Sequence, residues 1–180
     1  NDNITCIGGA SETGTGGAGG AVTFSDLVTI DENITIDTSG GVGNSGANNG
    51  AGGAILFTTT LDATVAEPLT LTAAGATDGV IDFKQAVGSG TPLGLVTIND
   101  AAAVKAWSTF QCAGFSQTTA GTGTIQFVGL LTSSAAVTIT ATTVDLDLGI
   151  TTTAGSDAGL VTLTGSVDVN LAAAATITTA

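Results

Sequence analysis

Hydrophobic and polar positions alternate along much of this chain in short runs with a period of two residues. In Val22-Thr23-Phe24 and in 137–140 (Val-Thr-Ile-Thr), large apolar side chains alternate with threonine. In a β-strand this alternation buries the apolar side chains and exposes the threonines, whose branched side chains suit an exposed strand face. No stretch keeps an apolar stripe at helical spacing, and only 99–107, with its run of alanines, is compatible with a helix. The pattern predicts an all-β protein.

One short motif occurs repeatedly: glycine, then an apolar residue at the third position and Phe or Leu at the fifth. Its copies are Gly20–Phe24, Gly53–Phe57, Gly79–Phe83, Gly123–Phe127 and Gly159–Leu163. An apolar-Thr-apolar run follows each copy, and these runs are Ile34–Ile36, Leu69–Leu71, Val96–Ile98, Val137–Ile139 and the weaker Ala175–Ile177. Repetition at this scale indicates one supersecondary unit stacked on itself. The copies are spaced 33, 26, 44 and 36 residues apart, which suits short strands joined by turns of variable length. We expect the final Phe or Leu of each copy to lie in the core: Phe24, Phe57, Phe83, Phe127 and Leu163.

Two glycine-rich stretches, Gly8–Gly20 and Gly40–Gly53, interrupt the first third of the chain. Each runs directly into the start of a predicted strand, so we interpret them as long turns that project from one edge of the stack. We expect their Gly and Asn residues to supply the positive φ angles that tight turns require. The length of 180 residues and the hydrophobic fraction of 43% then fit a single repetitive domain over residues 1–180.

The charge balance limits the possible partners. The chain has 15 acidic residues, no His and two cationic residues, Lys84 and Lys105, for a net charge of −13. Nucleic acids and anionic membranes are bound by clustered cations, so neither is an expected partner. The carboxylates are scattered, and we interpret them as a solvated surface. No apolar run is long enough to span a membrane.

The residue types also restrict the chemistry. Without His, a Ser-His or Cys-His nucleophile pair and a His-ligated metal are impossible. Glycoside hydrolysis needs only two carboxylates, and the best pairs are Asp145/Asp147 and Asp78/Asp82. On a strand, Asp145 and Asp147 would lie about 6.5–7 Å apart on one face. We nevertheless interpret them as solvated outer-face residues, and we assign no catalytic, cofactor-binding or metal-binding residue and no enzymatic activity.

The segment Val104–Phe115 holds three aromatic residues, Trp107, Phe110 and Phe115. They form either an exposed contact patch on which a carbohydrate could stack, or a coil whose large side chains fill a wider cross-section of the core. We favour the second interpretation.

Two segments of the chain, Gly88–Asn99 and Gln117–Gly129, resemble repeats of very large bacterial surface proteins of the filamentous-haemagglutinin and autotransporter-adhesin kind. The resemblance is best over residues 79–180. The sequences Gly19–Val22 and Gly52–Ile55 also resemble the first half of the polymorphic outer-membrane-protein repeat. The second half of that repeat, Phe-x-x-Asn, is absent here. Both resemblances imply a right-handed parallel β-helix and a location outside the cell.

We therefore expect a structural, non-catalytic segment of an extracellular or cell-surface protein that forms a stiff, adhesive rod or fibre. One alternative is a β-sandwich or jelly-roll subunit that polymerises into a pilus-like filament by strand exchange. Another is a module that binds ice or a glycan through a Thr-rich face, suggested by the Thr runs at 58–60 and 151–153. Regular Thr-x-Thr ranks at every coil are lacking.

The remaining expectations concern the ends, the cysteines and the modification sites. The last residues of the sequence still have the pattern of a strand, so we expect either further coils in a longer polypeptide or docking of a second copy. At the start of the sequence, we expect either that a signal peptide has been removed or that the chain is an excised piece. Cys6 and Cys112 should lie in distant coils, and we predict that they form no intrachain disulfide. Asn3 and Asn33 each begin an N-glycosylation sequon.

Overall fold

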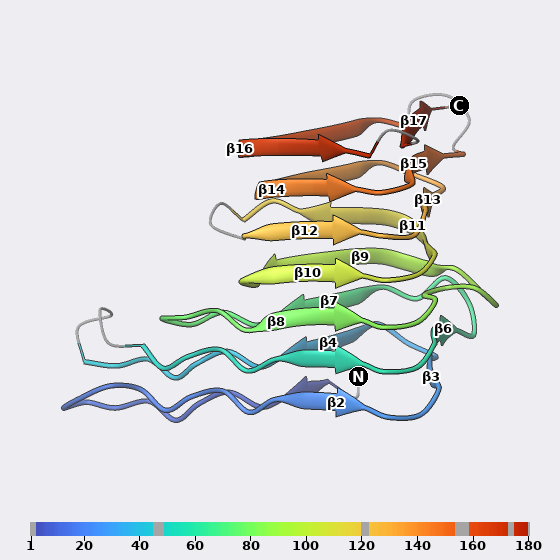
Figure 1. Cartoon of the computed structure of the whole chain (residues 1–180). Helices are drawn as coiled ribbons and strands as arrows, with labels where there is room; N and C mark the ends of the chain where they lie inside the picture. Colours follow the sequence, from blue (N-terminus) through green and yellow to red (C-terminus); the bar gives the residue numbers. More distant parts are fainter. Residues whose placement is uncertain (1–2, 45–48, 120–122, 154–158, 173–174, 180) are drawn as a thin grey trace.

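The chain winds upward in successive coils, as a parallel β-helix (Figure 1). The computed structural model describes residues 3–44, 49–119, 123–153, 159–172 and 175–179, without the side chains of 166–170. In Figure 1 the front strands run to the right and the fainter rear strands return to the left while the chain rises, so the coil is right-handed. Every strand pairing in the described part of the chain is parallel. This confirms the predicted β-helix over the sandwich, in which antiparallel neighbours were expected.

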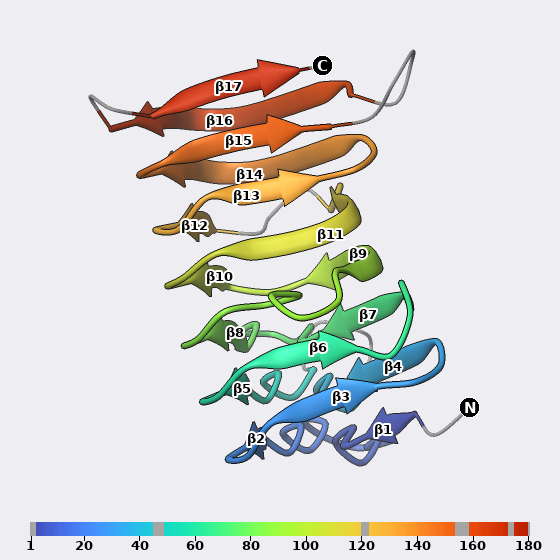
Figure 2. The same ribbon diagram turned by 90° about the vertical axis from the view of Figure 1, so that its right-hand side faces the viewer.

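Each coil contributes strands to a front, a side and a rear face. The front face contains β2 (Val22–Phe24), β5 (Ile55–Phe57), β8 (Val80–Phe83), β10 (Ala103–Ala106), β12 (Thr124–Phe127) and the end of β14 (Val137–Leu146). The side face, seen in Figure 2, contains β3 (Val28–Ile30), β6 (Leu61–Ala63), β13 (Leu131–Ser133), β15 (Gly149–Thr152), β17 (Thr176–Thr179) and the start of β11 (Phe110–Gln117). The rear face contains β1 (Ile4–Thr5), β4 (Ile34–Asp37), β7 (Leu69–Thr72), β9 (Leu93–Asp100), the rest of β11, the start of β14 and the start of β16 (Val161–Leu171). Because β11, β14 and β16 bend from one face to the next, most strands join a single 15-stranded sheet.

The predicted core residues form a ladder inside the front face. Phe57, Phe83 and Phe127 are buried as predicted, and Phe24 is half-buried against them. The rings of Phe24 and Phe57 stack with centroids 4.7 Å apart, and those of Phe57 and Phe83 stack at 5.1 Å. Parallel, in-register strands place identical side chains directly above one another, so their rings stack.

Between Phe24 and Phe127, one coil has no Phe at this position. Ala106 pairs in register with both Phe83 and Phe127, and the space that its small side chain leaves is occupied from the other faces. Phe110 meets Phe83 edge-on at 5.3 Å and Phe127 at 5.6 Å, while Phe115 meets Phe127 at 5.4 Å. The interpretation of Phe110 and Phe115 as core-filling residues is therefore confirmed.

The repeat motif was assigned correctly in its first copies and wrongly at the end. Gly159–Leu163 was expected to follow the front-face copies, but Val161–Leu163 pairs with Val137–Ile139 on the rear face. Ala175–Ile177 was expected to follow the rear-face runs, yet β17 pairs with β15 on the side face. The cause is that β14 turns from rear to front as one continuous strand, without the glycine that precedes β2, β5, β8 and β12.

Glycine-rich hairpins project from one side of the helix, at the left in Figure 1, as predicted. We call the described residues of 6–21, 38–54 and 73–79 the glycine bundle. None of these described residues is assigned to a helix or strand, and in Figure 2, where they are seen nearly end-on, they trace narrow coils. Their glycines often recur at every third residue, as in Gly14-x-x-Gly17-x-x-Gly20. Both features are typical of polyproline II helices, which have three residues per turn.

Backbone hydrogen bonds hold the glycine bundle together. Within hairpins, the Gly17 amide donates to the Gly9 carbonyl at 2.7 Å and the Gly50 amide to the Gly41 carbonyl at 2.8 Å. Between hairpins, the Gly41 amide donates to the Gly17 carbonyl at 2.8 Å. A Cβ atom on Gly50 would lie 1.9 Å from the Gly17 carbonyl oxygen. The expected reason for these glycines was wrong: none of those described in the bundle has positive φ, and glycine is needed because the backbones approach so closely.

The segment that sequence alone left compatible with a helix forms the end of β9 and β10 instead. None of the described residues belongs to a helix long and apolar enough to cross a membrane.

Candidate functional site

The apolar-Thr-apolar runs stack on the rear face and expose one row of hydroxyl side chains. The strands pair in register, so the central residue of each run lies beside that of the next coil. The row is Thr35, Thr70, Thr97, Ser116, Thr138 and Thr162, all partly exposed. We call these residues the threonine row. It contains no charged and no aromatic side chain.

A second set of polar side chains lies two residues further along these strands and is less regular. The register shifts between Leu71 and Thr72 where β7 meets β9, and the Asn99 side-chain amide donates to the Thr72 hydroxyl at 3.0 Å. The Thr runs at 58–60 and 151–153, which suggested a Thr-rich binding face, lie elsewhere. Thr58 donates to the Phe24 carbonyl at 3.0 Å, and Thr152 is buried and donates to the Gly159 carbonyl at 3.0 Å.

The outer side of the front face is charged and polar at the corresponding positions. Asp82, Lys105, Gln126 and Asp145 occupy one in-register column. The Gln126 side-chain amide donates to the Asp145 carboxylate at 3.0 Å. The front and rear faces thus share the same inner pattern but differ in their outer chemistry.

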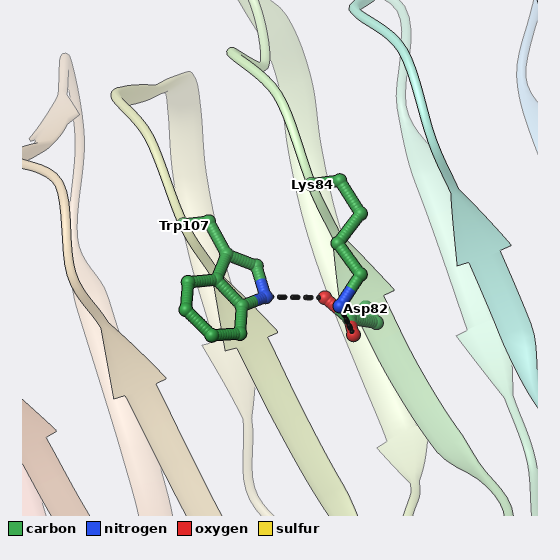
Figure 3. A network of polar contacts seen from close by, with 3 residues as sticks. All are labelled: Asp82, Lys84 and Trp107. Carbon is green, nitrogen blue, oxygen red and sulfur yellow. Dashed lines mark hydrogen bonds and ion pairs between the residues drawn. The ribbon is translucent and has the colours of Figure 1, made fainter.

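Trp107 lies at the centre of a polar network on the front face (Figure 3). Its indole Nε1 donates to Asp82 Oδ1 at 2.9 Å, and Asp82 also forms an ion pair with Lys84. The Lys105 Nζ atom lies 3.6 Å from the centroid of the Trp107 ring, and that of Lys84 lies 4.9 Å from it. Trp107 is 45% exposed. Of the three aromatic residues in Val104–Phe115, only this one fits the exposed contact patch considered from the sequence.

The carboxylate pairs considered from sequence have separate local partners. Asp78 accepts a hydrogen bond from the Gly75 amide at 2.8 Å, whereas Asp82 belongs to the Trp107 network. Asp145 lies near the C-terminal end of β14 and accepts a hydrogen bond from the Gln126 side chain, whereas Asp147 directly follows that strand. Among the described residues, no group of three His, Cys, Asp or Glu side chains is arranged to hold a metal ion.

Among the residues that the structure describes, two other titratable groups have shifted pKa values. Burial, reinforced by repulsion from Asp78 and opposed by a hydrogen bond from the Ala101 amide, raises the pKa of Asp100. Burial raises the pKa of the Cys112 thiol to about 12, so this thiol stays protonated and unreactive at neutral pH. Cys6 and Cys112 are both free: Cys6 directly follows β1 in the first coil, whereas Cys112 lies in β11, several coils later, as predicted.

Comparison with known proteins found no matching family model, no matching curated protein and no matching solved structure.

Proposed function

We propose that this chain is a non-catalytic structural segment of an extracellular or cell-surface protein, in which the β-helix acts as a stiff spacer for an adhesive surface. The supporting observation is the continuous in-register ladder from β2 to the end of β14, filled by stacked and edge-on Phe rings. Bending such a stack requires neighbouring coils to lose backbone hydrogen bonds and core contacts together.

The surface charge fits this role. A net charge of −13 keeps neighbouring molecules apart in solution and disfavours nucleic-acid or anionic-membrane partners. The resemblance of residues 79–180 to repeats of bacterial surface adhesins points to the same environment.

Immuno-electron microscopy of intact cells that produce the protein tests this proposal. We expect gold label on the outside of unpermeabilised cells, and a protease added to intact cells should remove it. Label that appears only after permeabilisation would contradict the extracellular assignment. Hydrolysis of a polysaccharide by the purified chain, abolished by Asp145→Asn or Asp147→Asn, would contradict the non-catalytic one.

The threonine row favours a second candidate function, binding to the surface of ice. Hydroxyl groups repeat along the row at the spacing of adjacent strands, about 4.8 Å, and a methyl group accompanies each of them except at Ser116. Threonine is restricted at χ1, so these groups are held in similar orientations from coil to coil. A rear-face row without charge or aromatic rings suits an uncharged, regular surface better than a charged ligand.

Thermal hysteresis of the purified chain tests this second function. Thr97→Lys should abolish any freezing-point depression, because it places a charge and a long side chain in the middle of the row. The matched control is Gln126→Lys, which makes the same kind of change on the front face and should leave the depression intact. Absence of hysteresis in the unmodified chain would eliminate the ice-binding function but not the spacer.

A further inference from the structure

Both lysines of this chain lie against the same indole ring. Among 180 residues with 15 acidic side chains, Lys84 and Lys105 are the only cationic side chains. They come from adjacent coils, because β8 and β10 pair in register with Lys105 beside Asp82. Both Nζ atoms lie within 5 Å of the Trp107 ring centroid. Both cationic side chains of the molecule therefore lie at one point on the front face, where the carboxylate of Asp82 offsets one of the two charges.

Trp107 does not serve the core. The Phe side chains of this chain all pack inside the coils, whereas Trp107 points outward and is 45% exposed. Its ring is nevertheless held in one orientation, since Nε1 donates to Asp82 and the same carboxylate pairs with Lys84 (Figure 3). An aromatic platform fixed before binding loses little conformational entropy when a ligand arrives.

The chemistry of this cluster defines the ligand that fits it. The lysines attract an anionic group and can donate charge-assisted hydrogen bonds to it. The exposed indole offers a flat apolar surface to a ring with an apolar face. A sugar ring that carries a carboxylate has both features, whereas a neutral sugar lacks the charge and an acidic peptide lacks the ring.

We propose that Lys84, Lys105 and Trp107 form a binding site for the uronic-acid units of an acidic polysaccharide, with Asp82 as the residue that positions Trp107 and Lys84. The sugar ring packs against the part of the indole that Lys105 leaves exposed, and its carboxylate pairs with Lys105 and with Lys84, which it shares with Asp82. The site deepens the proposed adhesive role and rests on it for the natural source of the polysaccharide.

Intrinsic fluorescence offers a direct test, because Trp107 is the only Trp and the chain contains no Tyr. Titration with oligogalacturonate should give a saturable change in Trp107 emission. The double variant Lys84→Gln/Lys105→Gln should weaken binding by about tenfold or more, since each lost charge-assisted contact contributes on this scale. The matched control is Gln111→Glu, which lies on the side face and lowers the net charge, as each lysine replacement does. It should leave the affinity within about twofold.

Two replacements of Trp107, one that removes the aromatic ring and one that keeps an aromatic ring, separate the contribution of stacking from that of charge. Trp107→Ala, followed by calorimetry, should weaken binding as strongly as loss of the lysines, and Trp107→Phe should restore part of the affinity. The proposal is overturned if oligogalacturonate gives no saturable response, or if a neutral oligosaccharide or poly-glutamate binds equally well. Binding by the purified chain together with an intracellular location would remove the proposed surface role and leave the site in place.

Discussion

The glycine bundle and the strand-forming part of each coil, here called the β-coils, fill the space between their stacked layers in opposite ways. In the β-coils, side chains fill the space between the faces, and the core consists of Phe and aliphatic residues such as Phe83 and Ile55. In the glycine bundle, the backbones themselves are in contact, and a Cβ on Gly50 or Gly41 would lie about 2 Å from a carbonyl oxygen. Hydrogen bonds between layers continue from one region into the other.

The comparison shows that stacking of coils does not depend on a hydrophobic interior alone. The bundle replaces buried apolar area with direct backbone hydrogen bonds, which are satisfied only if no side chain intervenes. The two regions should therefore respond to opposite substitutions: the coils to loss of side-chain volume, and the bundle to its gain.

The largest effect is expected in the coils. Phe83→Ala removes a fully buried ring that stacks on Phe57 and meets Phe110 edge-on, and it should lower the free energy of unfolding by about 3–5 kcal/mol. Phe24→Ala, at the half-buried end of the same ladder, should cost less. Urea unfolding followed by circular dichroism measures both, and equal losses would contradict the assigned burial.

A smaller effect is expected in the bundle. Gly50→Ala would place a Cβ 1.9 Å from the Gly17 carbonyl oxygen, and we expect a loss of about 1–3 kcal/mol from the separation of the layers. Gly9→Ala is the matched control, since a Cβ atom on Gly9 would have no other atom within 4 Å. Thermal unfolding of the pair checks this, and indistinguishable midpoints would show that the bundle is not tightly packed.

The smallest effect is expected where the two regions meet, between Asp100 of β9 and Asp78 of the bundle. Because the pKa of Asp100 is raised in the folded chain, its ionisation disfavours folding, and this cost disappears as the pH falls through the raised pKa. Asp100→Asn should stabilise the chain at pH 7 by less than about 1 kcal/mol. The gain should vanish near pH 3. Asp26→Asn, at an exposed position, is the control. An equal gain in stability from this variant would contradict the assignment of the Asp100 effect to burial.

The sequence predicted the coils better than the bundle because each relies on a different signal. The alternation in 22–24 and 137–140 reports directly which side chains face the core, so the faces could be assigned. The coil that contains Ala106 was missed because its core position holds a small residue and its space is filled from Phe110 and Phe115. The wide spacing between Gly79 and Gly123 conceals that coil.

The bundle and the outer surfaces depend on contacts between distant residues. Glycine at every third position, which is typical of polyproline II helices, was the available signal for the glycine bundle, but it does not by itself say which backbones meet. The threonine row was present in the runs at 34–36, 69–71, 96–98 and 137–139, and it emerged only once the register was known. The convergence of Lys84 and Lys105 on Trp107 likewise required the pairing of β8 with β10.

Hydrogen exchange of individual backbone amides tests most directly whether the coils and the glycine bundle form one ordered stack. The amides of Gly17, Gly41 and Gly50 donate to backbone carbonyls at 2.7–2.8 Å, so they should be protected from exchange together with the β-strand amides of the coils. Exchange of these glycine amides at the rate of an unfolded chain, while the strands remain protected, would show that the glycine-rich segments are flexible turns and would contradict this account.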